Sequence, residues 1–288
     1  MGSLQDVLAE QLAANRSSGD LWDVFASHRA RLTELCANAA PPGGSGRLCV
    51  LGAGNANDLD LEALARCYRS IVLVDLDADA LERAVQRQNA ATRAVLVREA
   101  PVDVSGLLGR LQRWAAMQVT PEELVGHAEQ TANGLRTRLG APFDVVLSAC
   151  LLTQMQLGLL TVLGERHQLF EAARFTLTQS HLRVLSALTA PGGRALFACD
   201  LTANDIAPAI TNAAPESLPE LVTELVAQGH VFQVANPELV REIARDDPKL
   251  AVELELMPSL ATWLWRNGTS RTFLVYALEG RRRPESDP

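Results

Sequence analysis

The sequence predicts an α/β fold: a doubly wound, mostly parallel seven-stranded sheet with a C-terminal antiparallel hairpin, preceded by an N-terminal helical extension. Three observations support this fold class. Short apolar runs alternate with helical segments, which is typical of a parallel sheet covered by helices on both faces. The last two apolar runs flank an Asn-Gly pair, a strong hairpin signal because both residues tolerate positive φ. Helical periodicity dominates the first forty residues instead.

The N-terminal segment is expected to form a helical cap over residues 1–40. Trp22, Phe25 and Leu32 recur at helical spacing, and Asp20 stands where its side chain could cap the start of the helix. A stretch rich in Pro and Gly then ends the helix and serves as a short linker.

One α/β domain is expected to follow, over residues 47–280. Its strands are predicted at 48–51, 71–74, 94–97, 143–147, 195–199, 260–265 and 272–278, with helices at 58–68 and 78–88. Two largely helical insertions, near 105–140 and 201–249, are expected to overhang the C-terminal edge of the sheet, where open α/β folds bind ligands.

Composition limits the class of protein. Hydrophobic residues make up 48% and charged residues 21%, with a net charge of −8, so a dedicated nucleic-acid binder is disfavoured. No apolar stretch approaches the roughly 18 residues of a membrane helix, and no signal peptide is apparent, so a cytoplasmic protein without a membrane partner is expected. The five cysteines lack a C-x-x-C pair, which favours reduced thiols and no metal site.

A glycine turn follows the first predicted strand. Gly52 and Gly54 allow backbone conformations and close ligand approach that a side chain would block. Asp75 ends the second strand 21 positions after Gly54, where a carboxylate can accept both hydroxyls of a ribose. The alternatives are a turn without a ligand and a solvated or capping acid, although Asp77 suits the cap of the next helix better.

The segments Gly-Ala-Gly-Asn-Ala and Val-Asp-Leu-Asp resemble motif I and its acidic partner in the class I (Rossmann-like) methyltransferases that use S-adenosylmethionine (SAM). The similar organisation covers residues 47–279. Val50 replaces an acid that the family often has, and Ala56 replaces the third glycine. Asn57 stands where a dinucleotide motif requires glycine, which favours SAM over NAD.

The resemblance implies SAM contacts in four places. In this family the fourth strand ends beside the sulfonium that donates the methyl group. The implied cofactor-binding residues are Gly52, Ala53, Gly54, Asn55, Asp75, Leu76, Asp103, Val104, Ser148 and Ala149. Asp103 would contact the adenine amine, with helix capping as its alternative. Backbone carbonyls at Ser148 and Ala149 would receive the amino group, and Asn55, Asn57 or Asp58 would substitute for the missing acid.

No catalytic residue is identified for the acceptor. The N-P-P-Y and P-C signatures of the family are absent, and Cys150 suits pocket lining or core better than nucleophilic attack. Thr153 and Gln154 are the polar candidates for touching an acceptor. His28, beside Arg29, is the first candidate for a base, but methyl transfer needs only alignment and desolvation.

The sequence therefore predicts a SAM-dependent methyltransferase with a small-molecule acceptor, a protein side chain being the less favoured one. The alternatives are a catalytically silent SAM-binding protein and, less favoured, an NAD(P)-dependent oxidoreductase. No nucleic-acid partner is expected, and a homodimer is left open.

Overall fold

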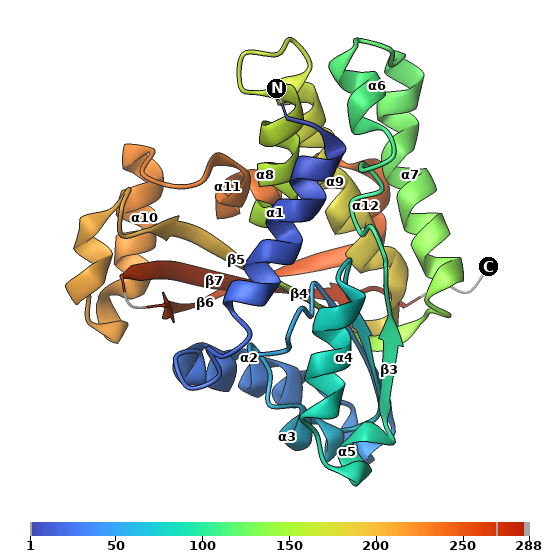
Figure 1. Cartoon of the computed structure of the whole chain (residues 1–288), viewed down its shortest axis with the longest axis vertical. Coiled ribbons are helices and arrows are strands. Elements are labelled where there is room, and N and C mark those ends of the chain that lie inside the picture. Colours follow the sequence, from blue (N-terminus) through green and yellow to red (C-terminus); the bar gives the residue numbers. More distant parts are fainter. Residues whose placement is uncertain (1, 269, 285–288) are drawn as a thin grey trace.

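A computed structural model describes residues 2–268 and 270–284 (Figure 1). Its seven-stranded sheet has the order β3-β2-β1-β4-β5-β7-β6; β7 runs antiparallel to both β5 and β6, and the other four strand pairs are parallel. The strands are β1 (Gly46–Leu51), β2 (Tyr68–Val74), β3 (Leu96–Glu99), β4 (Phe143–Ala149), β5 (Thr189–Ala203), β6 (Leu254–Asn267) and β7 (Arg271–Arg282). The predicted fold class, a Rossmann-like sheet closed by an antiparallel hairpin, is confirmed.

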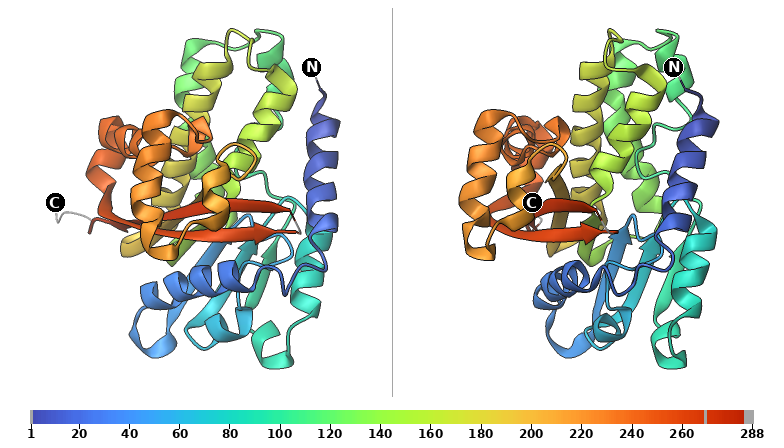
Figure 2. Two further views of the ribbon diagram at one scale, coloured as in Figure 1. Left: turned by 90° about the vertical axis from the view of Figure 1, so that its left-hand side faces the viewer. Right: turned by 60° about the vertical axis from the view of Figure 1, so that its left-hand side comes forward.

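Helices cover both faces of the sheet (Figure 2). One face carries α2 (Ala26–Ala39), α3 (Leu61–Ala65) and α4 (Ala78–Gln86), with α5 (Ala90–Arg93) packed beside α3. The other face carries α1 (Leu4–Ser17), α6 (Leu111–Ala115), α7 (Pro121–Arg138), α8 (Leu151–Leu163), α9 (Phe170–Leu188), α10 (Leu218–Gln228), α11 (Pro237–Asp246) and α12 (Pro248–Glu253). Among the residues that the structure describes, no helix is long and apolar enough to cross a membrane.

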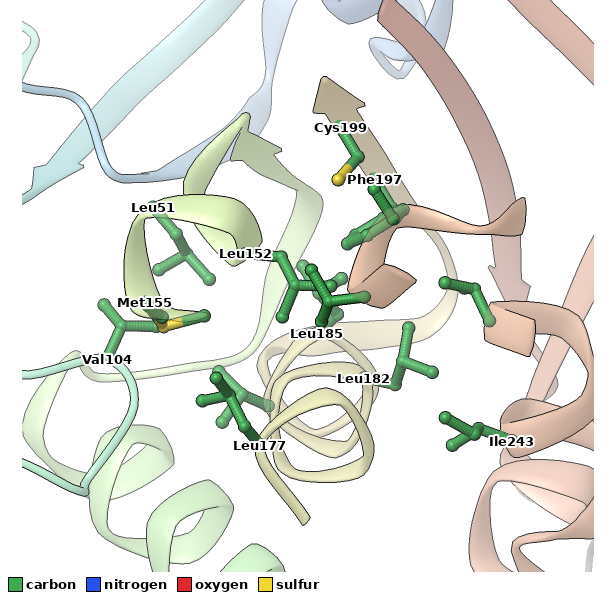
Figure 3. Close-up of a cluster of buried hydrophobic side chains, with 14 of the residues drawn as sticks. Leu51, Val104, Leu152, Met155, Leu177, Leu182, Leu185, Phe197, Cys199 and Ile243 are labelled. Carbon is green, nitrogen blue, oxygen red and sulfur yellow. The ribbon is translucent and has the colours of Figure 1, made fainter. Parts of the chain in front are cut away.

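The central strands are buried on both faces, which is why they read as continuous apolar runs. In β1, Leu48 and Val50 face the α2–α4 layer, whereas Cys49 and Leu51 face the layer of α8 and α9. Figure 3 shows the second core, in which Leu51, from the end of β1, lies near Leu152 of α8. This core therefore packs against the C-terminal ends of the central strands.

Several predicted boundaries were wrong. The helix predicted at 58–68 is only α3, capped by Asp60, and Tyr68 already belongs to β2. The third strand lies two residues later than predicted. Asp20 caps no helix: α2 begins at Ala26 with Phe25 at the N-cap and no side-chain cap. The backbone between α1 and α2 is held instead by the bond from Arg29 Nη1 to the Trp22 carbonyl (2.6 Å) and by the distant bond from Asn57 Nδ2 to the Ser18 carbonyl (2.6 Å).

Two further features concern the predicted insertions and the hairpin. Leu107, Leu108 and Leu111 of the insertion near 105–140 line a cavity at the C-terminal edge of the sheet, whereas α7 packs along α9 as part of the helical layer. The hairpin turn lies between Asn267 and Arg271, which still pair, and Gly268 takes a φ of +77°. Asn267 therefore stays in β6, and only the glycine of the pair supplies positive φ.

Candidate functional site

A cavity of about 200 Å³ lies at the C-terminal ends of β1 and β2. Eight of the ten predicted cofactor-binding residues line it: Gly52, Ala53, Gly54, Asn55, Asp75, Leu76, Asp103 and Val104. Ser148 and Ala149 line neither this cavity nor the one next to it. The Ser148 hydroxyl forms a buried hydrogen bond with His181 Nε2 of α9 (2.8 Å), and the predicted role of the two backbone carbonyls stays a prediction.

The glycine loop turns sharply at the end of β1. The amides of Gly52 and Ala53 both donate to the Val74 carbonyl of β2, at 2.9 and 3.1 Å. Gly52 has a φ of +76°, and a Cβ there would lie 3.1 Å from the Leu151 side chain. Any side chain at this position would therefore be strained and crowded, which explains the glycine.

Asp75 is joined to this loop by direct hydrogen bonds. Its Oδ2 accepts from the Gly54 amide at 2.7 Å, and its Oδ1 accepts from the Asp77 amide at 2.9 Å. Burial raises the pKa of Asp75, while these amides oppose the rise. Each carboxylate oxygen has a second lone pair, so Asp75 can still accept hydroxyl donors from the cavity.

Asp103 uses both carboxylate oxygens within its own loop. Oδ1 accepts from the amides of Ser105 and Gly106, at 2.9 and 3.1 Å, and Oδ2 accepts from the Leu108 amide at 2.8 Å. These bonds hold the loop and cap no helix, because α6 begins at Leu111 with Arg110 at the N-cap and no side-chain cap. The Asp103 side chain nevertheless lines the cavity next to Val104, so the adenine contact stays a prediction.

Asn55 and Asn57 hold the end of α1 over the glycine loop. Asn55 Nδ2 donates to the Asn15 carbonyl at 2.5 Å, and Asn57 Nδ2 donates to the Ser18 carbonyl at 2.6 Å. Asn55 Oδ1 in turn accepts from Arg83 Nε at 3.2 Å. Because these amides are engaged within the protein, they are poor replacements for the missing family acid.

Asp58 also lines the cavity and is the better replacement, because its Oδ1 accepts no hydrogen bond within the described chain. Burial raises its pKa to about 7, against the opposing charge of Arg29. Asp58 Oδ1 lies 3.5 Å from His28 Nε2, and neither atom has a hydrogen-bond partner within the described chain. A carboxylate in this position favours a cationic group of a bound ligand.

His28, the first candidate for a base, lies outside both cavities. It is fully buried, it stacks on Trp265 at 4.4 Å between ring centroids, and its Nδ1 accepts from Trp263 Nε1 at 2.9 Å. Burial lowers the pKa of His28 to about 3, so the ring is neutral. These contacts give His28 a packing role.

A second cavity of about 750 Å³ adjoins the first. The two share lining residues from α1, α8 and β6: Val7, Gln11, Ala14, Gln154, Gly158, Trp265 and Asn267. The predicted acceptor contacts Thr153 and Gln154 both line this larger cavity, as does Cys150, whose pKa burial raises well above its usual value. The Cys150 thiol is therefore protonated, in line with the pocket-lining interpretation.

Sequence reasoning missed Asp200. It follows the apolar run of β5, lines the second cavity and is 8% exposed. Its Oδ1 accepts from Thr153 Oγ1 at 2.6 Å, and burial raises its pKa to about 7. The available signal was an acid at the C-terminal end of a buried parallel strand, the same signal that identified Asp75.

Metal-binding geometry is not found among the described residues, where no group of three His, Cys, Asp or Glu side chains could hold an ion. All five cysteines are free thiols, and four of them are buried.

The comparisons with known proteins add structural similarities. No protein-family model matches the chain, and no curated protein matches it. A SAM-dependent methyltransferase from Methanosarcina mazei aligns over 87% of this chain and 98% of its own, with 11% identity and a TM-score of 0.46. The N-methyltransferase NodS from Bradyrhizobium japonicum aligns over 93% and 99%, with 17% identity and a TM-score of 0.40. The O-methyltransferase TomG from Streptomyces achromogenes, solved with SAM, aligns over 95% and 88%, with 15% identity and a TM-score of 0.42.

Proposed function

We propose that this protein is a SAM-dependent methyltransferase that acts on a small molecule. The observation that carries the proposal is the pairing of two adjoining cavities at the C-terminal edge of the sheet. The first is built from the glycine loop and Asp75, which suit a nucleoside. The second is larger and has its own polar groups, which suits a separate acceptor.

The residues of the first cavity fit SAM in chemical type. Gly52 and Gly54 leave the backbone free to approach the ligand, and Asp75 has lone pairs for ribose hydroxyls. Asp58 supplies a carboxylate for an ammonium group, in place of the family acid whose position Val50 occupies. Bound SAM supplies an electrophilic methyl group carried on a sulfonium.

The chain's own contribution is alignment and exclusion of water. Helix α1 packs against α8 and lines both cavities, and its C-terminal end is bonded to the glycine loop. A wall shared by two ligands fixes their relative position, which is the main requirement of methyl transfer. No side chain needs to form a covalent bond to the acceptor.

Binding measurements test the cofactor. Calorimetry with SAM, S-adenosylhomocysteine and NAD should show binding of the two sulfur ligands and none of NAD. A failure of both sulfur ligands to bind at high concentration would contradict the proposal, and binding of NAD alone would favour an oxidoreductase. Release of S-adenosylhomocysteine with candidate acceptors then separates an enzyme from a silent SAM-binding protein.

A further inference from the structure

The larger cavity is lined by more acidic than basic side chains. Its charged lining residues are Glu10, Glu165, Glu171, Asp200 and Arg271. Arg271, the one cation among them, lies 3.7 Å from Asp205, and Glu171 is paired with Arg174, so within the described residues Glu10, Glu165 and Asp200 are left without an opposite charge in an ion pair. The side chains around the ligand space therefore carry a net negative charge, which favours a cationic ligand over an anionic one.

Asp200 is the buried member of this set. More than nine-tenths of the residue is shielded from solvent, yet it lines the cavity. Thr153 donates to Oδ1, and no other side chain in the described chain donates to this carboxylate. Besides this hydroxyl, Asp200 has, among the described residues, only the opposing charge of Arg271 and a backbone amide to compensate its burial, so a cation placed beside it gains a charge-assisted hydrogen bond.

Aromatic side chains make up much of the remaining wall. Phe170, Phe232, Trp265 and Phe273 all line the cavity. Such rings bury an apolar ligand body, although one face of Phe273 already carries Arg271 and Trp265 stacks on His28. The combination of one buried carboxylate with several rings is complementary to an amine that has an apolar or aromatic body.

We propose that the acceptor is an organic amine that binds as its ammonium cation against Asp200, with its apolar part between the aromatic side chains. For transfer, the Asp200 carboxylate takes the ammonium proton; the neutral amine nitrogen then forms a bond to the methyl carbon as the bond from that carbon to sulfur breaks, and S-adenosylhomocysteine leaves. That this amine is a methyl acceptor rests on the proposed methyltransferase function. That the cavity prefers an amine does not depend on that function. Hydroxyl and carboxylate compounds of the same shape are therefore the competing ligands that a test must include.

Tryptamine, tryptophol and indole-3-propionate form a suitable probe set, because they share an indole body and carry a positive, neutral and negative group. Their binding to the full chain is measured by calorimetry without SAM. We expect tryptamine to bind at least about ten-fold tighter than the other two, a difference of about 1.4 kcal/mol. Equal or tighter binding of tryptophol or indole-3-propionate, or no saturable binding of tryptamine, would overturn the proposal.

The variant Asp200→Asn tests the residue. Asparagine keeps an oxygen for the Thr153 hydroxyl but removes the charge, so tryptamine affinity should fall about ten-fold while tryptophol affinity stays the same. Asp246→Asn is the matched control, because Asp246 is exposed and outside both cavities. Unchanged tryptamine affinity in a folded Asp200→Asn protein would remove Asp200 from the site.

The same preparation titrated with S-adenosylhomocysteine keeps the two proposals distinguishable. If this ligand fails to bind while tryptamine retains its preference, the methyltransferase function fails and the amine site stands. If it binds while tryptamine shows no preference, the amine proposal alone fails.

Discussion

Asp200→Asn should also make the protein more stable at alkaline pH. The replacement has nearly the same shape, and its amide oxygen can still accept the Thr153 hydroxyl. What it removes is a carboxyl group that must ionise in a buried position. The stability of the wild type should therefore depend on pH in a way that the variant's does not.

The magnitude follows from the pKa of Asp200, which burial raises from 3.8 to about 7. A shift of about 3 units corresponds to about 4 kcal/mol of unfolding free energy. The raised pKa belongs to the folded state, so the protonated Asp200 carboxyl is favoured by folding. The wild type therefore has its full unfolding free energy below about pH 4 and loses about 4 kcal/mol of it as the pH rises through about 7. Asp58, with a similarly raised pKa, changes in both proteins alike and cancels in the difference.

Urea unfolding followed by circular dichroism, from about pH 5 to about pH 8, measures this difference. Across this range the variant should gain about 3 kcal/mol on the wild type, because about two-thirds of the shift from 3.8 to about 7 lies above pH 5, and Asp246→Asn should gain nothing. A stability difference that stays constant with pH would refute the reasoning, because it would mean that Asp200 ionises as freely in the folded protein as in the unfolded chain.

Three further predictions concern the first cavity and its surroundings. Asp75→Ala should weaken SAM binding by about 1–3 kcal/mol in calorimetry, as expected for hydrogen bonds to a charged group. The surface variant Asp79→Ala should leave SAM binding unchanged. Equal affinities of Asp75→Ala and the wild type would mean that the ribose lies elsewhere. His28→Ala should lower the unfolding free energy by about 2–4 kcal/mol in urea, because it leaves a void and an unpaired Trp263 indole, but SAM affinity should persist. A loss of SAM binding in folded His28→Ala would contradict the packing role. Asn15→Ala, which removes the bond from Asn15 Nδ2 to Asp77 Oδ2 (3.2 Å), should speed S-adenosylhomocysteine dissociation roughly five-fold in stopped-flow measurements; an unchanged rate would show that α1 does not retain the ligand.

The fold could be predicted from the sequence because its signals are local. Alternating strand and helix patterns specify a parallel sheet, and neighbouring parallel strands end at the same edge. This is why a spacing of 21 residues was enough to place Asp75 beside Gly54, where the structure shows a hydrogen bond of 2.7 Å. The motif and its partner are close in space because β1 and β2 are adjacent in the sheet.

The remainder depends on contacts between distant segments. Asp20 has the right residue type for a cap, but the turn that contains it is shaped by Arg29 and Asn57. The contact between Asn55 and α1 could not be predicted, because its partner Asn15 is 40 positions away in the sequence. Asp200 could not be assigned to a cavity until the hairpin and α8 were in place around it.

The bonds between α1 and the glycine loop have a thermodynamic consequence. Because α1 lines both cavities, any displacement that exposes one ligand also loosens the contacts of the other. A ligand in either cavity that orders α1 removes part of the entropic cost of binding the second. We therefore expect positive and reciprocal coupling between donor and acceptor: each should raise the affinity of the other by the same factor, with no subunit interface needed to transmit the effect.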